Sequence, residues 1–208
     1  MPEIIAPMDI EKRSMEIISE TLGSRVLDPE NEAVIKRVIH STADFDFADT
    51  LTFSEHAVSK GIEALRSGCD IVTDTQMAKA GINKRILASL GGEVHCFMSD
   101  PDVAEEAKAR GITRAAVSME KAAKLTKPCI YAIGNAPTAL FALRELIDSG
   151  QLNAALIIAV PVGFVNVVES KELIIASSVP YIAARGRKGG SPVAAAICNA
   201  MLYRIRRD

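Results

Sequence analysis

Aromatic side chains are scarce in this chain of 208 residues: they make up 4% of the sequence, and tryptophan is absent. A protein that binds nucleic-acid bases by stacking needs such side chains, so this class of function is not expected. The formal net charge of -2 points the same way, because a nucleic-acid partner favours a strongly basic surface. With 49% apolar and 24% charged residues, the composition is that of an ordinary globular protein.

Cysteines are also few, and no two of the four lie close together in the sequence. None forms a CxxC pair, and we expect buried free thiols in a reducing cytoplasm for Cys69, Cys96, Cys129 and Cys198. The longest apolar run, Ala154 to Val165, is too short to span a bilayer. The N-terminus, MPEIIAPMDIEKRS, has no basic stretch followed by an apolar run, so neither a signal peptide nor a membrane partner is expected.

Common catalytic and cofactor motifs are missing. No GxGxxG or GxxxxGK[ST] follows any predicted strand, and there is no GxSxG, HExxH or CxxC. The chain therefore gives little support to nucleotide, hydrolase or zinc chemistry, and no metal ligand is assigned.

Two amphipathic helices are predicted near the N-terminus. Asp9 is a candidate N-cap for a helix that runs to Leu22, and Gly23 ends it. Asp28-Pro29 predicts the cap and first position of a second helix, because proline suits the first turn. A third helix is predicted from about 53 to 66. The apolar stripe of the second helix consists of Val34, Ile35, Val38 and Ile39.

After residue 66, short apolar runs alternate with helical segments. The runs are CDIVTD (69–74), EVHCFM (93–98), PCIYAIG (128–134), ALIIAVPVG (155–163) and VPYIAARG (179–186). Helices are predicted near 75–89, 101–109, 113–125, 136–148 and 165–176, with a last one from Ser191 towards Arg204. Continuous apolar strands suit a parallel sheet covered on both faces. We therefore predict one domain over residues 1–208, a three-layer α/β/α sandwich with a mainly parallel five-stranded sheet on which the helices of residues 1–66 pack.

In such a sheet, ligands bind outside the carboxyl ends of the strands. The run RGRKGGS, Arg185 to Ser191, lies at one of these ends and contains Arg187 and Lys188. Cations beside a helix start can form an anion site, although a solvated basic loop is an equally good interpretation. At another strand end, GNAPT predicts Asn135 as the cap of the next helix.

The stretch VIKRVIHSTADFDF, Val34 to Phe47, places an arginine and a histidine three residues apart. At about 100° per residue, Arg37 and His40 lie nearly opposite the apolar stripe of their helix. His40 is therefore either solvated or faces a cavity or partner subunit. Arg37 disfavours a second positive charge nearby, whereas the carboxyl end of the helix and a bound polyanion favour one. His40 is thus suited to give a proton once an anionic substrate is bound.

Ser14 lies on the apolar face of the first predicted helix, four residues from both Ile10 and Ile18. Its hydroxyl either bonds back to a carbonyl within the helix or lies at the edge of a site.

Six segments occur in order along the chain: KRS (12–14), RVIH (37–40), GITRAA (111–116), AIGNAPTALFAL (132–143), PVGFVNVVESKE (161–172) and RGRKGGS (185–191). Together they make nearly the whole chain resemble the precorrin-8X methylmutase family, which includes the cobalt-precorrin-8 methylmutases. The resemblance implies a flavodoxin-like homodimer that acts in cobalamin (vitamin B12) synthesis. It further implies that a methyl group moves from C11 to C12 of a polycarboxylate tetrapyrrole, giving hydrogenobyrinate or cobyrinate without a cofactor.

The resemblance also implies roles for particular residues. His40 matches the family's catalytic histidine, whose proposed role is to protonate a pyrrole nitrogen. Ser14, Arg37 and Arg114 match substrate-contacting positions. The cations that we expect to meet the peripheral carboxylates are Arg37, Arg185, Arg187 and Lys188.

Two other functions stay open on the sequence alone. A non-catalytic corrinoid carrier would share the anion-binding residues without requiring His40. A flavodoxin-like electron carrier would need a stacking aromatic and a phosphate loop, for which TDTQM (73–77) is a poor candidate. The sequence does not choose between cobalt-containing and metal-free substrates.

Overall fold

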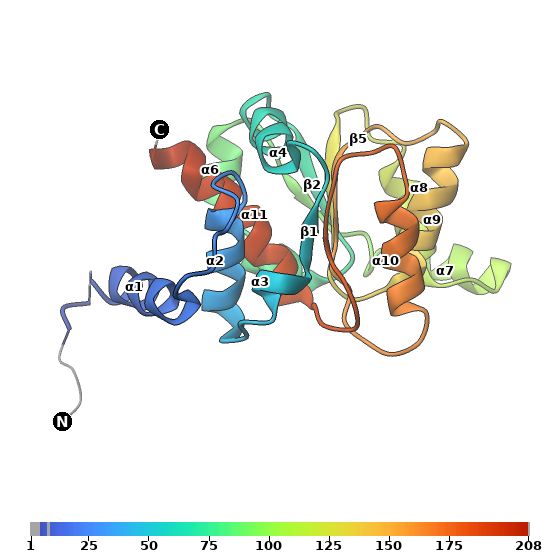
Figure 1. The fold of residues 1–208 in the computed structure, drawn as a ribbon. Helices are drawn as coiled ribbons and strands as arrows, with labels where there is room; N and C mark the ends of the chain where they lie inside the picture. Colours follow the sequence, from blue (N-terminus) through green and yellow to red (C-terminus); the bar gives the residue numbers. More distant parts are fainter. Residues whose placement is uncertain (1–4, 8, 208) are drawn as a thin grey trace.

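A six-stranded sheet lies between two layers of helices in the computed structural model, which describes residues 5–7 and 9–207 (Figure 1). The strands follow the order β1-β6-β5-β4-β2-β3, and all neighbours are parallel except β1 and β6. Their bounds are β1 Leu51–Phe53, β2 Asp70–Thr73, β3 Val94–His95, β4 Cys129–Ile133, β5 Ala154–Ala159 and β6 Tyr181–Ala184. The predicted three-layer, mainly parallel sandwich is therefore confirmed.

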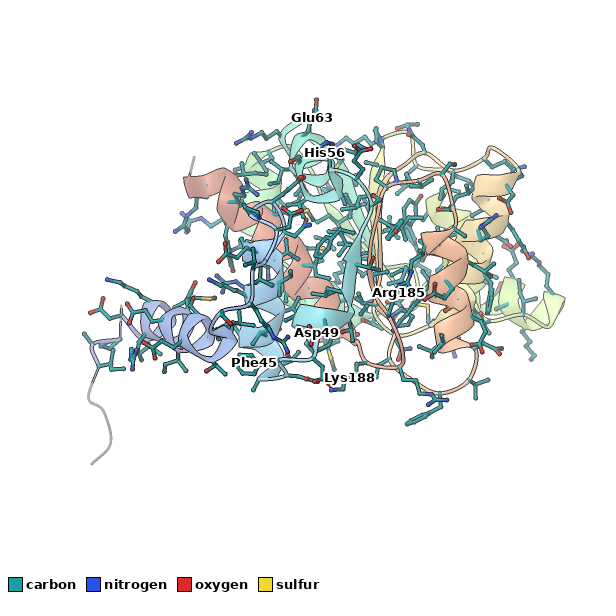
Figure 2. The ribbon with its side chains drawn as sticks, in the orientation of Figure 1. Phe45, Asp49, His56, Glu63, Arg185 and Lys188 are labelled. Carbon is teal, nitrogen blue, oxygen red and sulfur yellow. The ribbon has the colours of Figure 1, made fainter. Side chains whose placement is uncertain are left out.

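Seven helices of the described chain belong to one side of the molecule: α1 Ile10–Leu22, α2 Glu32–Thr42, α3 Phe47–Thr50, α4 Ala57–Arg66, α5 Gln76–Gly81, α6 Lys84–Ser89 and α11 Ser191–Arg207. The other side carries α7 Pro101–Arg110, α8 Arg114–Ala122, α9 Pro137–Asp148 and α10 Val167–Ile175. Phe45, Asp49 and Lys188 mark the end of the molecule where the parallel strands finish (Figure 2).

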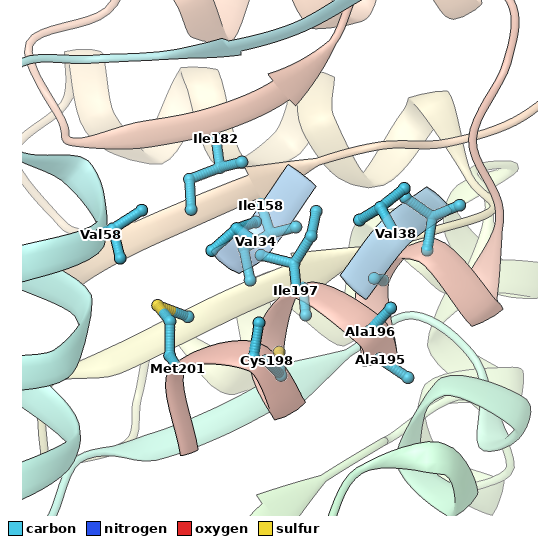
Figure 3. Packing of buried hydrophobic residues seen from close by; sticks show 14 of the residues in the cluster. Val34, Val38, Val58, Ile158, Ile182, Ala195, Ala196, Ile197, Cys198 and Met201 are labelled. Carbon is cyan, nitrogen blue, oxygen red and sulfur yellow. The ribbon is translucent and has the colours of Figure 1, made fainter. Parts of the chain in front are cut away.

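The central strands are buried on both faces because their alternate residues enter two different cores. Ile130 of β4 and Ile158 of β5 belong to the core beneath α2, α4 and α11 (Figure 3). Tyr131 and Ile157, one position away, belong to the core beneath α8, α9 and α10. This explains why the strands appear in the sequence as unbroken apolar runs.

The sheet has one strand more than predicted. The segment Leu51–Phe53 pairs antiparallel with β6, so the helix predicted from about 53 begins only at Ala57. A strand of three residues is too short to show an alternation in the sequence. The helix predicted over 75–89 is also divided, because Asn83 caps α6 by accepting the N–H of Ile86.

Two predicted helix caps are wrong. The second helix begins at Glu32, since Asp28 instead accepts the N–H of Glu30 in a turn before the helix. Asn135 does not cap α9 with its side chain. The carboxylate of Asp74, just after β2, accepts the N–H groups of residues 134–136 at 2.9, 2.8 and 2.6 Å. Asp74, which is distant in sequence, thus accepts the N–H bonds that a local N-cap residue was expected to accept.

The four cysteines are free and buried, as predicted. In residues 5–7 and 9–207, no group of three His, Cys, Asp or Glu side chains is arranged to hold a metal ion. No helix of this part of the chain has the length and apolar character needed to span a bilayer.

Candidate functional site

Helix α1 crosses the exposed face of α2 one turn before His40. Arg37 Nη2 donates to Glu11 Oε1 at 2.7 Å, and Lys36 Nζ donates to Ser19 Oγ at 2.9 Å. Both contacts join the two helices at the second turn of α2. Figure 1 shows α1 projecting sideways from the body of the molecule at this crossing.

A groove of about 470 Å³ lies between α1, the first half of α2 and the end of α11. Arg37 forms part of its wall, and its guanidinium lies 5.1 Å from the ring centroid of Tyr203. A smaller pocket of about 250 Å³ shares Glu11 and Tyr203 with the groove and also includes Asn83 and Arg206. Polar and cationic groups therefore surround the groove on the side away from His40.

His40 is exposed in the single chain, as the helical wheel predicts, while the apolar stripe of α2 is buried. It lies on the same face as Ala33, Lys36 and Arg37, three of the α2 residues that line the groove. The imidazole is thus at the carboxyl end of α2 and open to a substrate or a second chain.

Ser14 lies on a different flank of α1 from the residues that line the groove. Glu11, Met15 and Ser19 line the groove at the amino half of α2. Ser14 is half-buried, and its hydroxyl donates to the carbonyl of Ile10 at 2.8 Å, which is the back-bonded arrangement. Beside it, Ile10 and Ile17 expose 53% and 44% of their surface, so this flank presents one hydroxyl among apolar side chains.

Lys188 joins the basic loop to the segment that follows α2. We define the basic loop as residues 185–190. Lys188 Nζ donates to Asp44 Oδ2 and Asp46 Oδ2, both at 2.6 Å (the labelled Phe45 of Figure 2 lies between these aspartates in sequence). The aspartates raise the pKa of Lys188, and Lys188 in turn lowers the pKa of Asp44. The basic loop thereby meets the segment just after α2, where Asp44 is four residues beyond His40 in sequence.

The two arginines of the basic loop face the other layer of helices. Arg185 Nη2 lies 3.6 Å from Glu172 Oε2 of α10, and the Arg187 guanidinium lies 5.9 Å from the centroid of the Phe164 ring. Phe164 is 84% exposed, and Val165 beside it is 78% exposed. This loop lies in the segment PVGFVNVVESKE, but sequence reasoning gave Phe164 and Val165 no role, although a position at a strand end was a signal for one.

Arg114 stands apart from the other predicted site residues. It is the exposed first residue of α8, which packs beneath the opposite face of the sheet from α2. Thr113 caps this helix by accepting the N–H of Ala116, and its hydroxyl donates to Thr138 of α9. In a single chain Arg37 and His40 thus share the exposed face of α2 and Lys188 contacts the segment after that helix, whereas Arg114 begins a helix on the other side of the sheet.

Two buried charged residues support the carboxyl edge of the sheet, and sequence reasoning assigned them no role. Lys171 of α10 is fully buried, and its Nζ donates at 2.8 Å to the carbonyls of both Gly186 and Lys188. Asp74 is also fully buried and organises the start of α9. Burial raises the pKa of Asp74, and its three backbone N–H bonds oppose that rise. Burial lowers the pKa of Lys171 to about 8.

Comparison with known proteins gives consistent matches over nearly the whole chain. The family model for precorrin-8X methylmutase matches residues 9–204. The chain is 48% identical to a cobalt-precorrin-8 methylmutase of Salmonella typhimurium, with 99% of each protein covered. It is 42% identical to a precorrin-8X methylmutase of Pseudomonas aeruginosa, with 82% of each covered. A crystal structure of the precorrin-8X methylmutase of Thermus thermophilus superposes with a TM-score of 0.87 at 36% identity, covering 96% of this chain and 98% of that one.

Proposed function

Because the chain belongs to the precorrin-8X methylmutase family, we infer that it is an isomerase of cobalamin biosynthesis. It moves a methyl group from C11 to C12 of precorrin-8X or cobalt-precorrin-8, giving hydrogenobyrinate or cobyrinate. The observation that carries this conclusion is the end-to-end match to methylmutases at up to 48% identity. Relatives named for the cobalt form and for the metal-free form match in overlapping ranges of identity, so the proposal covers both substrates.

Within this function, His40 is the group that gives a proton to the tetrapyrrole. Protonating the ring nitrogen beside the migrating methyl withdraws electron density from the π-system and lowers the barrier. The exposed position of His40 at the carboxyl end of α2 supports this role, because a helix carboxyl end favours a positive charge. Ser14, half-buried on α1, is proposed to contact the same ring.

The peripheral carboxylates of the substrate bind to arginine and lysine side chains. Arg37 already holds one carboxylate, that of Glu11, so a substrate carboxylate would take the place of Glu11. Arg187 has no carboxylate partner in the part of the chain that the structure describes, and it stacks beside the exposed Phe164. Arg185 and Lys188 pair with Glu172 and the aspartates near α2, and they contribute by longer-range attraction.

The active unit is a homodimer in the cytoplasm, with the site near the interface between the chains. The exposed Ile10 and Ile17 of α1 support such an interface, since apolar residues on an outlying helix gain from being covered. A second chain would also explain how Arg114, remote from His40 within one chain, takes part in the same site. Light scattering tests this assembly: a monomer at micromolar concentration would contradict it.

Incubation of the purified protein with each substrate form tests the function directly. The absorbance of the corrin chromophore should appear with time for at least one form, without any added cofactor. If neither substrate is converted, the proposed function is wrong.

The carrier alternative is separated from the enzyme by a His40→Asn variant. A carrier binds the corrinoid equally well with or without the imidazole and converts nothing. If wild type converts substrate, and His40→Asn binds product but no longer converts substrate, the protein is an enzyme and the proposal holds.

A further inference from the structure

Lys171 is an unusual lysine, because its whole side chain is buried while its amine bonds only to backbone carbonyls. Among the described residues, no carboxylate pairs with it. A buried amine is costly unless its hydrogens are bonded, so the two carbonyls are what make this position tolerable. Those carbonyls belong to Gly186 and Lys188, the residues on either side of Arg187.

We propose that Lys171 is a positioning residue for substrate binding: its amine fixes the middle of the basic loop, so that Arg187 and Lys188 face the substrate from a set position. This inference rests on the proposed function, because it assigns those cations to the substrate carboxylates.

The two ends of the basic loop are fixed independently of Lys171. At its start, the N–H of Arg185 donates to the Thr50 carbonyl at 2.8 Å. At its end, the N–H of Gly190 donates to the Val160 carbonyl at 2.8 Å, and a Cβ on Gly189 would lie 2.1 Å from that same oxygen. Both ends are therefore bonded to backbone next to a strand, because Thr50 directly precedes β1 and Val160 directly follows β5.

The middle of the loop depends more on Lys171. The other contacts of residues 186–188 are one longer backbone bond, 3.2 Å from Gly163 N–H to the Arg187 carbonyl, the contact of Arg187 with the exposed Phe164 ring, and the exposed ion pairs of Lys188. Exposed ion pairs contribute little to a fixed geometry. Gly186 has a φ of 78°, a conformation that resists other residues but does not itself hold the loop. The buried amine is thus the main internal support of residues 186–188.

Lysine suits this task at any protonation state. A charged amine has three hydrogens and a neutral one has two, and each form can donate to both carbonyls. The low pKa, about 8, follows from burial alone and does not remove the bonds. Methionine has nearly the same length and volume but cannot donate, so Lys171→Met removes the support without opening a large cavity.

Limited trypsin digestion tests the positioning without any substrate. The basic loop contains three cleavage sites, after Arg185, Arg187 and Lys188, and a fixed loop resists the protease. Lys171→Met should be cleaved there about tenfold faster than wild type, as expected from a more frequent local opening. The control is Lys60→Met, which removes an exposed lysine bonded to the Glu55 carbonyl at 2.9 Å and should leave cleavage in the loop unchanged.

Steady-state kinetics then separates positioning from general destabilisation. Lys171→Met should raise KM about tenfold and change kcat less than about threefold, because the loop binds the substrate rim and does not reach the reacting carbons. Adding Arg187→Met should reduce the affinity for substrate less in the Lys171→Met background than in wild type, because a misplaced Arg187 already contributes less to binding. A role in stability alone predicts equal costs.

The results distinguish this inference from the proposed function. If wild type converts no substrate, the proposed function fails and the trypsin result still decides the loop's support. If Lys171→Met shows wild-type cleavage and wild-type KM, the inference is overturned. Should Lys171→Met not fold, Lys171→Gln replaces it: one amide can serve one carbonyl, and cleavage between that of wild type and that of unfolded chain is expected. Wild-type cleavage and KM in Lys171→Gln would equally overturn the inference.

Discussion

Two regions of the molecule hold their charged groups in opposite ways. At the crossing of α1 and α2, Arg37 pairs with Glu11 through side chains alone, and Glu11 is 50% exposed. At the carboxyl edge of the sheet, Lys171 and Asp74 are fully buried and bond to backbone groups. Surface ion pairs contribute little and exchange readily, whereas a buried charge that loses its partners is strongly destabilising. The first region is thus suited to exchange partners with a substrate and the second to remain fixed.

The largest expected effect concerns the exposed region. His40→Asn should keep the fold but lower turnover by about 10²–10⁴, the usual contribution of a group that transfers a proton. The measurement is the rate of change of corrinoid absorbance. The matched control is His56→Asn, because His56 is also exposed, has a positive φ that asparagine tolerates, and begins α4 away from the site. Turnover of His40→Asn near that of His56→Asn would reject the role.

The next effect concerns the fixed region. Asp74→Ala leaves the N–H groups of Gly134, Asn135 and Ala136 without their acceptor, at about 1–3 kcal/mol each. The free energy of unfolding in urea should therefore fall by about 3 kcal/mol or more. Asp49→Ala is the exposed counterpart: it breaks an ion pair with Arg25 and should cost less than about 1 kcal/mol. Equal costs would remove the distinction between the two regions.

The difference between these regions also explains what the sequence could predict. The strands were recognisable because burial on both faces requires an unbroken apolar run such as Leu156–Ala159. The orientation of His40 was recognisable because the stripe of α2 fixes which side faces solvent. Both features depend on local periodicity.

The fixed region was not predictable, because its interactions join residues distant in sequence. Asp74 bonds the N–H groups at the start of α9 in place of a local cap, although it lies about 60 residues earlier in the sequence. Lys171 bonds the basic loop from α10, the helix that precedes the loop in sequence. In a sequence, Lys171 cannot be told from a surface lysine such as Lys60. The edge strand β1 was not predicted for a related reason: its partner strand, β6, is over a hundred residues away in sequence.

A third prediction uses pH. Burial lowers the pKa of Lys171 from an ordinary 10.5 to about 8. Below pH 8 the amine is charged in folded and unfolded chains alike, and the folded chain bears the cost of the buried charge. Between about pH 8 and 10.5 only the unfolded amine keeps its proton, so raising the pH favours the folded state. The free energy of unfolding of wild type should rise, relative to that of Lys171→Met, by up to about 3 kcal/mol across this range.

Urea unfolding of both proteins at several pH values between 7 and 10.5 provides the measurement. Taking the difference between the proteins cancels the other groups that titrate in this range. A difference that stays flat, or falls as the pH rises, would show that the Lys171 amine keeps an ordinary affinity for its proton.

A smaller effect is expected from Arg37→Ala. The substitution removes a two-pronged donor for one substrate carboxylate, so the Kd of the product should rise about tenfold, or about 1.4 kcal/mol. Arg25→Ala, which removes another arginine from a surface ion pair, should leave the Kd unchanged. The measurement is a titration followed by corrinoid absorbance, and an unchanged Kd for Arg37→Ala would count against its role.

The smallest effect tests whether Glu11 competes with the substrate for Arg37. Glu11→Gln keeps the size of the side chain and removes its charge, so stability should change by less than about 1 kcal/mol. Product should bind about twofold to fivefold tighter, because a carboxylate no longer has to be displaced. Glu16→Gln removes the same charge from the same helix, where it pairs with Arg13, and measures the general effect of a less negative surface. If Glu11→Gln binds product more weakly than Glu16→Gln does, Glu11 supports the position of Arg37, and the crossing of α1 and α2 is as fixed as the edge of the sheet.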